Sequence, residues 1–183
     1  MRWLILLSIA VCVACSSPVM DDEALTSSAV IHADWQVVND TVMGGVSVSR
    51  WSLSTQNHGI FSGDVSLDNY GGFASVRGGA PNGYFGDATK VKLRIKGDGK
   101  TYKFCIRTAQ MGRSVSYQHD VSTTEDWQEI VLPLDAFIPR WRGRVVGDAL
   151  PLNAADISGV GFLISDKQEG PFTLLVSRIE PTE

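Results

Sequence analysis

The sequence predicts an all-β fold, an antiparallel β-sandwich or jelly roll with little helix. Apolar residues recur at every second position in many short segments after about residue 31, and Gly, Asn, Asp and Pro separate these segments. Helical periodicity is scarce, since the only candidate helices are short turns at residues 134–137 and 153–157. Many short strands with frequent turns are typical of a sandwich or jelly roll.

Length and composition fit one globular domain. The chain has 183 residues, of which 44% are hydrophobic and 20% are charged, and a chain of this size buries enough surface for one hydrophobic core. Its formal net charge is −4. Nucleic-acid-binding proteins usually carry a basic domain or a basic stripe that neutralises phosphates, so no nucleic-acid partner is expected.

Residues 1–15 have the features of an export signal peptide. Arg2 supplies positive charge, a short apolar run follows to Ala14, and small residues adjoin Cys15. The run is too short for a permanent membrane-spanning helix, which needs about 20 residues. Its end, Val13-Ala14-Cys15, resembles the lipobox of bacterial lipoproteins, in which the cysteine becomes the acylated first residue, although Cys12 stands where such boxes usually have Leu. The sequence therefore predicts export to the bacterial cell envelope with a lipid anchor on Cys15 that faces the periplasm. A secreted or soluble periplasmic protein is the alternative.

Residues 16–30 form a predicted polar tether, because they lack a sustained apolar period and include the acidic run Asp21-Asp22-Glu23. Residues 31–183 then form a single sandwich domain. If the signal peptide is removed and Cys15 is acylated, Cys105 is the one free cysteine, so no internal disulfide is expected. Its place in an alternating run predicts a buried thiol without a chemical role.

The clearest strand is residues 90–96, in which Val91, Leu93 and Ile95 alternate with cations, so that one face is apolar and the other is solvated. Gly97-Asp98-Gly99 follows and predicts a tight hairpin that pairs this strand with residues 102–108. Similar runs predict the other strands, over residues 46–53, 60–67, 73–77, 115–121, 127–132, 160–164 and 172–179. Asn153 is placed to cap the second short helical turn.

No segment carries a recognisable catalytic or metal-binding pattern. His32, His58 and His119 are the only imidazole bases, and no nucleophile-elbow sequence accompanies them. Beyond Cys12 and Cys15, which lie in the predicted signal peptide, the sequence has no zinc-type spacing of Cys or His, and it has no acidic loop of the EF-hand kind. The glycine-rich stretches at residues 71–73 and 78–83 lack the fingerprint of a phosphate-binding loop. The sequence therefore predicts a protein that is not an enzyme and that has no metal and no cofactor.

Residues 35–47 differ from ordinary strand-and-turn sequence, because they mix apolar, amide and carboxylate side chains directly before a strand. Asn39 and Asp40 are suited to bridging backbone groups in a loop, and Gly44-Gly45 permits a close approach of the backbone. Two interpretations stay open, a structural knot and a ligand-facing loop. Asn39 and Asp40 are therefore candidate partner-binding residues.

Residues 137–144 concentrate three arginines around a tryptophan and form the most cation-dense part of the chain. Arg140, Trp141 and Arg142 are suited to recognising a carboxylate, a phosphate or an aromatic ring. A solvated basic loop is the alternative. Arg77 is the sixth candidate, as a member of one patch with Arg142 and Asp40.

These segments, in this order along the chain, resemble the complex I intermediate-associated protein 30 family. The resemblance covers about residues 33–179. It rests on residues 35–47, Phe61-Ser62-Gly63, residues 69–77, 127–133 and 137–143, and Gly161-Phe162. The resemblance implies a galactose-binding-like β-sandwich and a binding role, since the best-known members of the family are mitochondrial assembly chaperones for respiratory complex I.

Two functions follow from this resemblance. The first is a non-catalytic, assembly-factor-like interaction protein, a chaperone or scaffold that binds a protein partner at a membrane surface or in the cell envelope. The client of the mitochondrial members is not carried over, because an exported protein would be separated by the membrane from bacterial complex I assembly. The alternative is a carbohydrate-binding module of the bacterial envelope, for which Trp51, Tyr70, Tyr84, Trp141 and Arg77 are candidate sugar contacts.

Overall fold

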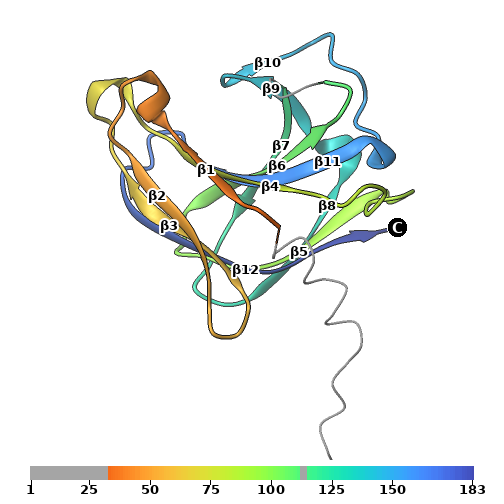
Figure 1. Cartoon of the computed structure of the whole chain (residues 1–183), viewed down its shortest axis with the longest axis horizontal. Coiled ribbons are helices and arrows are strands. Elements are labelled where there is room, and N and C mark those ends of the chain that lie inside the picture. The colour runs from red at the N-terminus through yellow and green to blue at the C-terminus, as the bar shows by residue number, and fades with distance from the viewer. Residues whose placement is uncertain (1–32, 112–114) are drawn as a thin grey trace, which may run out of the picture.

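The computed structural model describes residues 33–111 and 115–183, which form two antiparallel β-sheets packed face to face around one apolar core (Figure 1). The predicted signal peptide, the tether and Cys15 lie outside the described residues. The two sheets confirm the predicted all-β sandwich. Helix is confined to four short 3-10 turns in the described part of the chain: η1 (Asp40–Met43), η2 (Asp68–Tyr70), η3 (Leu134–Ala136) and η4 (Ala154–Asp156).

The strands divide unequally between the sheets. The seven-stranded sheet consists, in spatial order, of β1 (Gln36–Asn39), β4 (Ala74–Gly79), β11 (Ile157–Ile164), β6 (Thr101–Thr108), β7 (Ser116–Ser122), β9 (Ile138–Trp141) and β10 (Arg144–Val145). The five-stranded sheet consists of β2 (Val48–Leu53), β3 (Gly59–Val65), β12 (Gly170–Thr182), β5 (Lys90–Lys96) and β8 (Gln128–Pro133). All of the predicted strands are present within about three residues of their expected ends, and β1, β9 and β10 are strands that the sequence analysis did not predict.

Alternation along each strand sends one set of side chains into the core. Val91, Leu93 and Ile95 of β5 are fully buried, as the sequence predicts. Phe104 of β6 and Phe162 of β11 meet them from the other sheet as part of the same cluster. Because successive side chains point to opposite faces of a strand, the remaining residues of these strands stand on the outer face of each sheet.

The predicted hairpin between residues 90–96 and 102–108 is wrong. β5 pairs with β12 and β8, whereas β6 pairs with β11 and β7 in the other sheet. The chain turns at residues 97–99 and crosses between the sheets. There the Asp98 carboxylate accepts hydrogen bonds from the Tyr102 hydroxyl at 3.1 Å and from the Thr173 amide at 2.8 Å. Alternation identifies the buried face of each strand, but it does not say in which sheet that face lies.

Two tryptophans close one side of the sandwich. The Trp35 ring stacks on the Trp51 ring with centroids 4.2 Å apart, and Trp35 also stacks on Phe162 at 6.4 Å. Glycines make room for both indoles, since a Cβ at Gly78 would lie 2.7 Å from Trp35 and a Cβ at Gly59 would lie 2.2 Å from Trp51. Trp51 is therefore committed to packing.

Candidate functional site

A groove of about 1000 Å³ lies on the outer face of the seven-stranded sheet. Its floor is made by strands β4, β11, β6 and β7, and its sides are made by the loops around residues 42–43, 70–73 and 140–143. Figure 1 shows the loops that carry η1 and η2, in orange and yellow, on one side of this sheet and β9 and β10 on the other side. The groove therefore runs between two raised edges.

Two arginines lie next to each other on the floor of this groove. β11 lies between β4 and β6. In the register of the sheet, Gly161 of β11 is paired with Arg77 of β4 on one side and with Cys105 of β6 on the other. Gly159 of β11 is paired with Arg107 of β6. A Cβ at Gly161 would lie 2.4 Å from the Val76 carbonyl oxygen and 3.5 Å from Nη1 of Arg107. Because β11 carries glycine here, the Arg107 guanidinium extends over the β11 backbone toward Arg77.

Neither guanidinium has an ion-pair partner among the described residues. Arg77 and Arg107 are both half-buried, and Nε of Arg77 is buried without a hydrogen-bond partner in this part of the chain. Burial lowers the pKa of Arg77, and burial together with the charge of Arg77 lowers the pKa of Arg107. The two cations thus stand together at some electrostatic cost.

Lys103 lies on the same outer face of β6 as Arg107 but, unlike Arg107, has ion-pair partners. Its Nζ lies 2.8 Å from Asp120 and 2.6 Å from Asp166, so two carboxylates neutralise it. Burial lowers the pKa of Lys103, but the hydrogen bonds and charges of Asp120 and Asp166 outweigh burial and raise that pKa above its usual value. Lys103 is therefore a half-buried cation with its charge neutralised, whereas Arg77 and Arg107 have no such carboxylates among the described residues.

The two edges of the groove expose aromatic rings. Tyr70 is 99% exposed and has a φ of 61°, a left-handed conformation that is rare for a bulky residue. On the opposite edge Trp141 is 49% exposed, and the Arg142 guanidinium lies 5.3 Å from the centroid of its ring. Arg142 also has a positive φ, of 48°. Such conformations at a groove edge are a common mark of a functional surface.

Aliphatic side chains extend the edge on the Tyr70 side. Val42 and Met43, at the end of η1, are 73% and 61% exposed and both line the groove. Large aliphatic groups held at the surface of a loop are costly to leave in water, and a contiguous set of them marks an interaction surface. The groove therefore combines a cationic floor with an apolar and aromatic edge.

The Asp40 carboxylate holds this edge in place from inside the protein. Asp40 is fully buried and accepts four hydrogen bonds, from the Ser47 amide and hydroxyl and from the amides of Gly72 and Phe73. Burial raises the pKa of the Asp40 carboxyl, but these hydrogen bonds outweigh burial and hold the pKa below its usual value. Gly45 is required beside it, since a Cβ there would lie 2.4 Å from Asp40 Cγ. Of the two interpretations that the sequence left open, the geometry at Asp40 matches the structural knot.

The six predicted site residues separate into two groups. Arg77, Arg140, Trp141 and Arg142 all line the groove. Asn39 and Asp40 lie behind its edge, where the Asn39 side-chain oxygen accepts a hydrogen bond from the Ser49 hydroxyl at 2.6 Å. The expected patch of Arg77, Arg142 and Asp40 is therefore not formed, because the Asp40 carboxylate is buried and used by its own chain.

Sequence reasoning missed Arg107, Gln118 and Lys103, which also line the groove. Each is an ordinary polar residue on the outward face of an alternating strand. The signal that would identify Arg107 is its register opposite Gly159, about 50 residues away in the chain, and that register exists only in the folded sheet.

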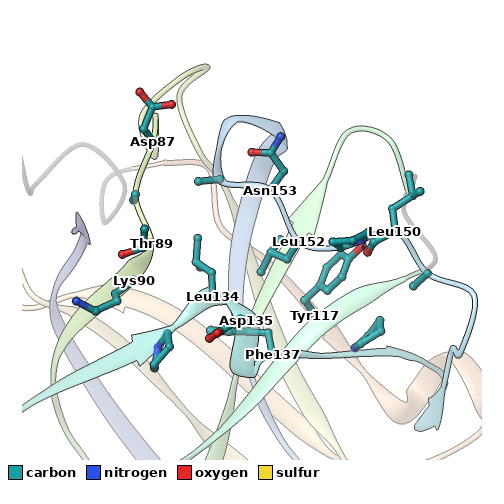
Figure 2. A pocket seen from close by; sticks show the side chains of 16 residues that line it. Asp87, Thr89, Lys90, Tyr117, Leu134, Asp135, Phe137, Leu150, Leu152 and Asn153 are labelled. Atoms are coloured by element: carbon teal, nitrogen blue, oxygen red, sulfur yellow. Dashed lines mark hydrogen bonds between the residues drawn. The ribbon is translucent and has the colours of Figure 1, made fainter.

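A second cavity of about 830 Å³ lies beside η3 and the segment that follows β10. Figure 2 shows Leu134, Leu152 and Tyr117 near its centre, with Lys90 and Asp87 to one side. The Tyr117 hydroxyl donates a hydrogen bond to the Leu150 carbonyl oxygen at 2.6 Å, so its polar atom already has a partner. This cavity offers a mainly apolar lining and no grouping of charges comparable to the groove floor.

The two histidines and the cysteine that the structure describes are each packed, hydrogen-bonded or buried. His58 packs against Trp127, with ring centroids 4.9 Å apart, and His119 Nδ1 lies 2.8 Å from the Asp120 carbonyl oxygen. Cys105 is buried, as predicted, and burial raises the pKa of its thiol to about 11. Within residues 33–111 and 115–183, no three His, Cys, Asp or Glu side chains gather to hold a metal ion. The same residues contain no helix long and apolar enough to cross a membrane.

The fold is a galactose-binding-like β-sandwich, the fold that is also found in carbohydrate-binding modules. The family 11 carbohydrate-binding module from Clostridium thermocellum, solved in complex with a β-1,3-1,4-mixed-linked tetrasaccharide, superimposes with a TM-score of 0.59. The match covers 82% of this chain and 91% of the module, at 16% sequence identity. An agarase also matches, with a TM-score of 0.54 and 13% identity over 82% of this chain and 24% of the agarase. At such identities the likeness establishes the fold alone.

The chain belongs to the complex I intermediate-associated protein 30 (CIA30) family, whose model matches residues 25–176. The resemblance found in the sequence is thereby confirmed. The mouse mitochondrial complex I intermediate-associated protein 30 is 28% identical over 79% of this chain, and the Neurospora crassa protein of that name is 21% identical over 89%. An uncharacterized Schizosaccharomyces pombe protein is 27% identical over 80% of this chain and 76% of its own length. The matched region spans 51% of the mouse protein and 67% of the Neurospora protein.

Proposed function

We propose that this chain is a non-catalytic, assembly-factor-like binding protein that holds a protein partner in the groove of the seven-stranded sheet. The observation that carries the proposal is the composition of the groove. Its edges expose Val42, Met43, Tyr70 and Trp141, and arginines lie on its floor. Tyr, Trp and Arg are the residues most enriched at the energetic centres of protein–protein interfaces.

Family membership supports the same reading. The mouse and Neurospora relatives are named for association with an intermediate of complex I. By analogy, the partner of this chain is a subunit of a membrane-associated complex, bound before assembly is complete. The groove edge supplies apolar area for such a partner, and burial of apolar area is the main favourable term in association.

The cellular location is part of the proposal. We infer from Cys15 and the preceding apolar run that the chain is exported and lipid-anchored in the bacterial envelope, although the mouse and Neurospora relatives are named as mitochondrial. Intact mass and membrane fractionation of the native protein, beside a Cys15→Ala variant, test this. The expected result is an acylated chain beginning at Cys15, with both the acyl mass and the membrane association lost in the variant. An unprocessed cytoplasmic chain would contradict it and would favour a partner in respiratory complex assembly.

Site-directed photo-crosslinking tests the binding function. A benzoylphenylalanine replaces Met43 or Trp141 on the two groove edges, and Val131 on β8 of the other sheet, 50% exposed, is the matched control position. We expect one and the same protein to be crosslinked from positions 43 and 141 and not from position 131. Capture of unrelated proteins from the two groove positions, or equal capture from the control, would refute the groove as the partner site.

A carbohydrate-binding role is the second candidate, because exposed rings of Tyr70 and Trp141 stand on opposite edges of the groove and the Gln118 amide lies in its lining. Aromatic faces with planar polar groups are suited to sugar rings. Trp51 and Tyr84 do not contribute, since Trp51 stacks on Trp35 and the Tyr84 hydroxyl donates to the Ile179 carbonyl. Binding to a neutral glycan array that is lost in Tyr70→Ala and Trp141→Ala would favour this candidate, and a flat array would remove it.

A further inference from the structure

The groove is electropositive in a chain that is acidic overall. Its lining includes the cations Arg77, Lys103, Arg107, Arg140 and Arg142 and a single carboxylate, that of Asp166. Asp166 is already paired with Lys103. The whole chain has a formal net charge of −4, so the positive charge of the groove is local. A concave surface of one sign concentrates ligands of the opposite sign.

The cations on the outer face of the five-stranded sheet provide a comparison. There Lys92 and Arg178 both pair with Glu180, at 3.1 Å and 3.7 Å, and the guanidinium of Arg94 lies 5.7 Å from the centre of the Trp127 ring. On the groove floor, Arg77 and Arg107 have neither a carboxylate nor a ring among the described residues. Lys92, Arg94 and Arg178 thus each have a carboxylate or a ring beside them, whereas this pair of arginines has neither in the part of the chain that the structure describes.

Like charges held together in a partly dry site favour the entry of an anion. Each guanidinium is desolvated and each disfavours the charge of the other, so an anion placed between them relieves both effects. A guanidinium presents a planar fork of N–H donors that matches the two oxygens of a carboxylate. Gly161 keeps the space above β11 free of a side chain, between the strands that carry the two arginines.

The surroundings favour a carboxylate carried by protein. A strand-like segment lying in the groove would place one acidic side chain on the floor and its neighbours against the groove edges, because alternate side chains point to opposite sides. The exposed aliphatic groups of Val42 and Met43 suit apolar neighbours in a polypeptide and offer nothing to the hydroxyls of a sugar acid.

We propose that Arg77 and Arg107 form a carboxylate-binding site that receives an Asp or Glu side chain of the protein partner. This proposal rests on the proposed function and names the chemistry of its partner. The remaining groove arginines steer the acidic segment toward the floor, and Tyr70 and Trp141 hold it from the two edges.

Fluorescence anisotropy with fluorescein-labelled hexaglutamate tests the site on the full chain. Arg77→Gln and Arg107→Gln should each weaken binding about tenfold, the loss expected when one member of a partly desolvated charge pair is removed. Arg50→Gln removes the same charge from an exposed position on β2 of the other sheet and should leave the affinity within about twofold. Arg77→Lys keeps the charge but loses the planar fork of donors, so its affinity for hexaglutamate should lie between those of the Arg77→Gln and Arg50→Gln variants.

Labelled hexalysine and tetragalacturonate are the companion probes. No binding of hexalysine is expected, and tetragalacturonate should bind more weakly than hexaglutamate. Tighter binding of tetragalacturonate would overturn the choice of a protein carboxylate and assign the site to acidic glycans. Equal hexaglutamate binding by the native protein and both Gln variants would overturn the site itself. If a Gln variant fails to fold, a structural role for that arginine is indicated and the proposal is likewise overturned.

The two proposals fail in distinguishable ways. If hexaglutamate does not bind but crosslinking from positions 43 and 141 recovers one protein, the groove function stands and the carboxylate site falls. If hexaglutamate binds through Arg77 and Arg107 but no protein is crosslinked, the anion site stands and the assembly-factor function falls.

Discussion

Charged side chains at two places in the same groove differ in whether their own chain supplies them with partners. The Asp40 carboxylate, fully buried behind one edge, receives four hydrogen bonds from its own chain. The guanidinium groups of Arg77 and Arg107, half-buried on the floor, have no ion pair in the described part of the chain. We interpret this difference as one between a charge that maintains the fold and charges that are available to a ligand. It also predicts opposite responses to mutation.

The largest expected effect is on Asp40. Asp40→Ala leaves the Ser47, Gly72 and Phe73 donors buried without their acceptor, and we expect the free energy of unfolding to fall by about 3 kcal/mol. Urea denaturation measures this change. Asp64→Ala, which removes an exposed carboxylate from β3, is the control and should change stability by less than about 0.5 kcal/mol. Equal losses of unfolding free energy in the two variants would show that the buried Asp40 carboxylate has no special role in the fold.

A smaller loss of stability is expected when Gly161 is replaced. Gly161→Ala places a Cβ 2.4 Å from the Val76 carbonyl oxygen and 3.5 Å from Nη1 of Arg107, and overpacking of this kind costs about 1–3 kcal/mol. Thermal denaturation gives the stability change, and anisotropy with hexaglutamate gives the effect on the groove. Gly79→Ala, where a Cβ would meet no atom within 4 Å, is the matched control on β4. A Gly161 variant as stable as the native protein would show that β11 does not need glycine there.

The pH dependence of stability sharpens the assignment of Asp40. Hydrogen bonds hold the pKa of Asp40 below its usual value, so the unfolded chain binds this proton more readily than the folded chain does. The corresponding stability is present above about pH 4 and is lost as the pH falls through the folded pKa. Urea midpoints between pH 2 and 6 should decrease toward acid more steeply for the native protein than for Asp40→Asn. Parallel curves would contradict the role given to this carboxylate.

The smallest effect on stability is expected from the groove arginines. Arg77→Gln and Arg107→Gln each relieve the repulsion between two desolvated cations, so the melting temperature should stay unchanged or rise slightly. Differential scanning calorimetry measures it. A drop in melting temperature comparable to that of Asp40→Ala would mean that the arginines are structural and that the two sites do not differ.

The same contrast explains what the sequence could and could not predict. The fold class followed from alternation, because residues such as Val91, Leu93 and Ile95 must bury one face of a strand. The assignment of strands to sheets did not follow, and the wrong hairpin at residues 97–99 shows why. A local pattern fixes which face is buried, whereas the Asp98 carboxylate at the crossing between the sheets accepts a hydrogen bond from the Thr173 amide, which lies far away in the sequence.

The residues of the candidate groove could likewise be predicted only in part, because a local pattern reveals some of them and long-range contacts define the others. The density of cations around Trp141 is visible along the chain, so Arg140 and Arg142 were identified. The role of Asp40 stayed open, because its donors at Gly72 and Phe73 lie more than 30 residues away. Arg107 was missed, since only its register against the glycines of β11 distinguishes it from any other outward-facing cation.

The roles given to Arg77 and Arg107 are tested most sharply by combining Arg77→Gln and Arg107→Gln in one chain that carries the photo-crosslinker at position 43. We expect this double variant to melt at or above the temperature of the native protein and no longer to capture the partner that the native sequence captures from that position. A double variant that melts well below the native protein while still capturing the partner would contradict this expectation, because the arginines would then serve the fold and not the groove.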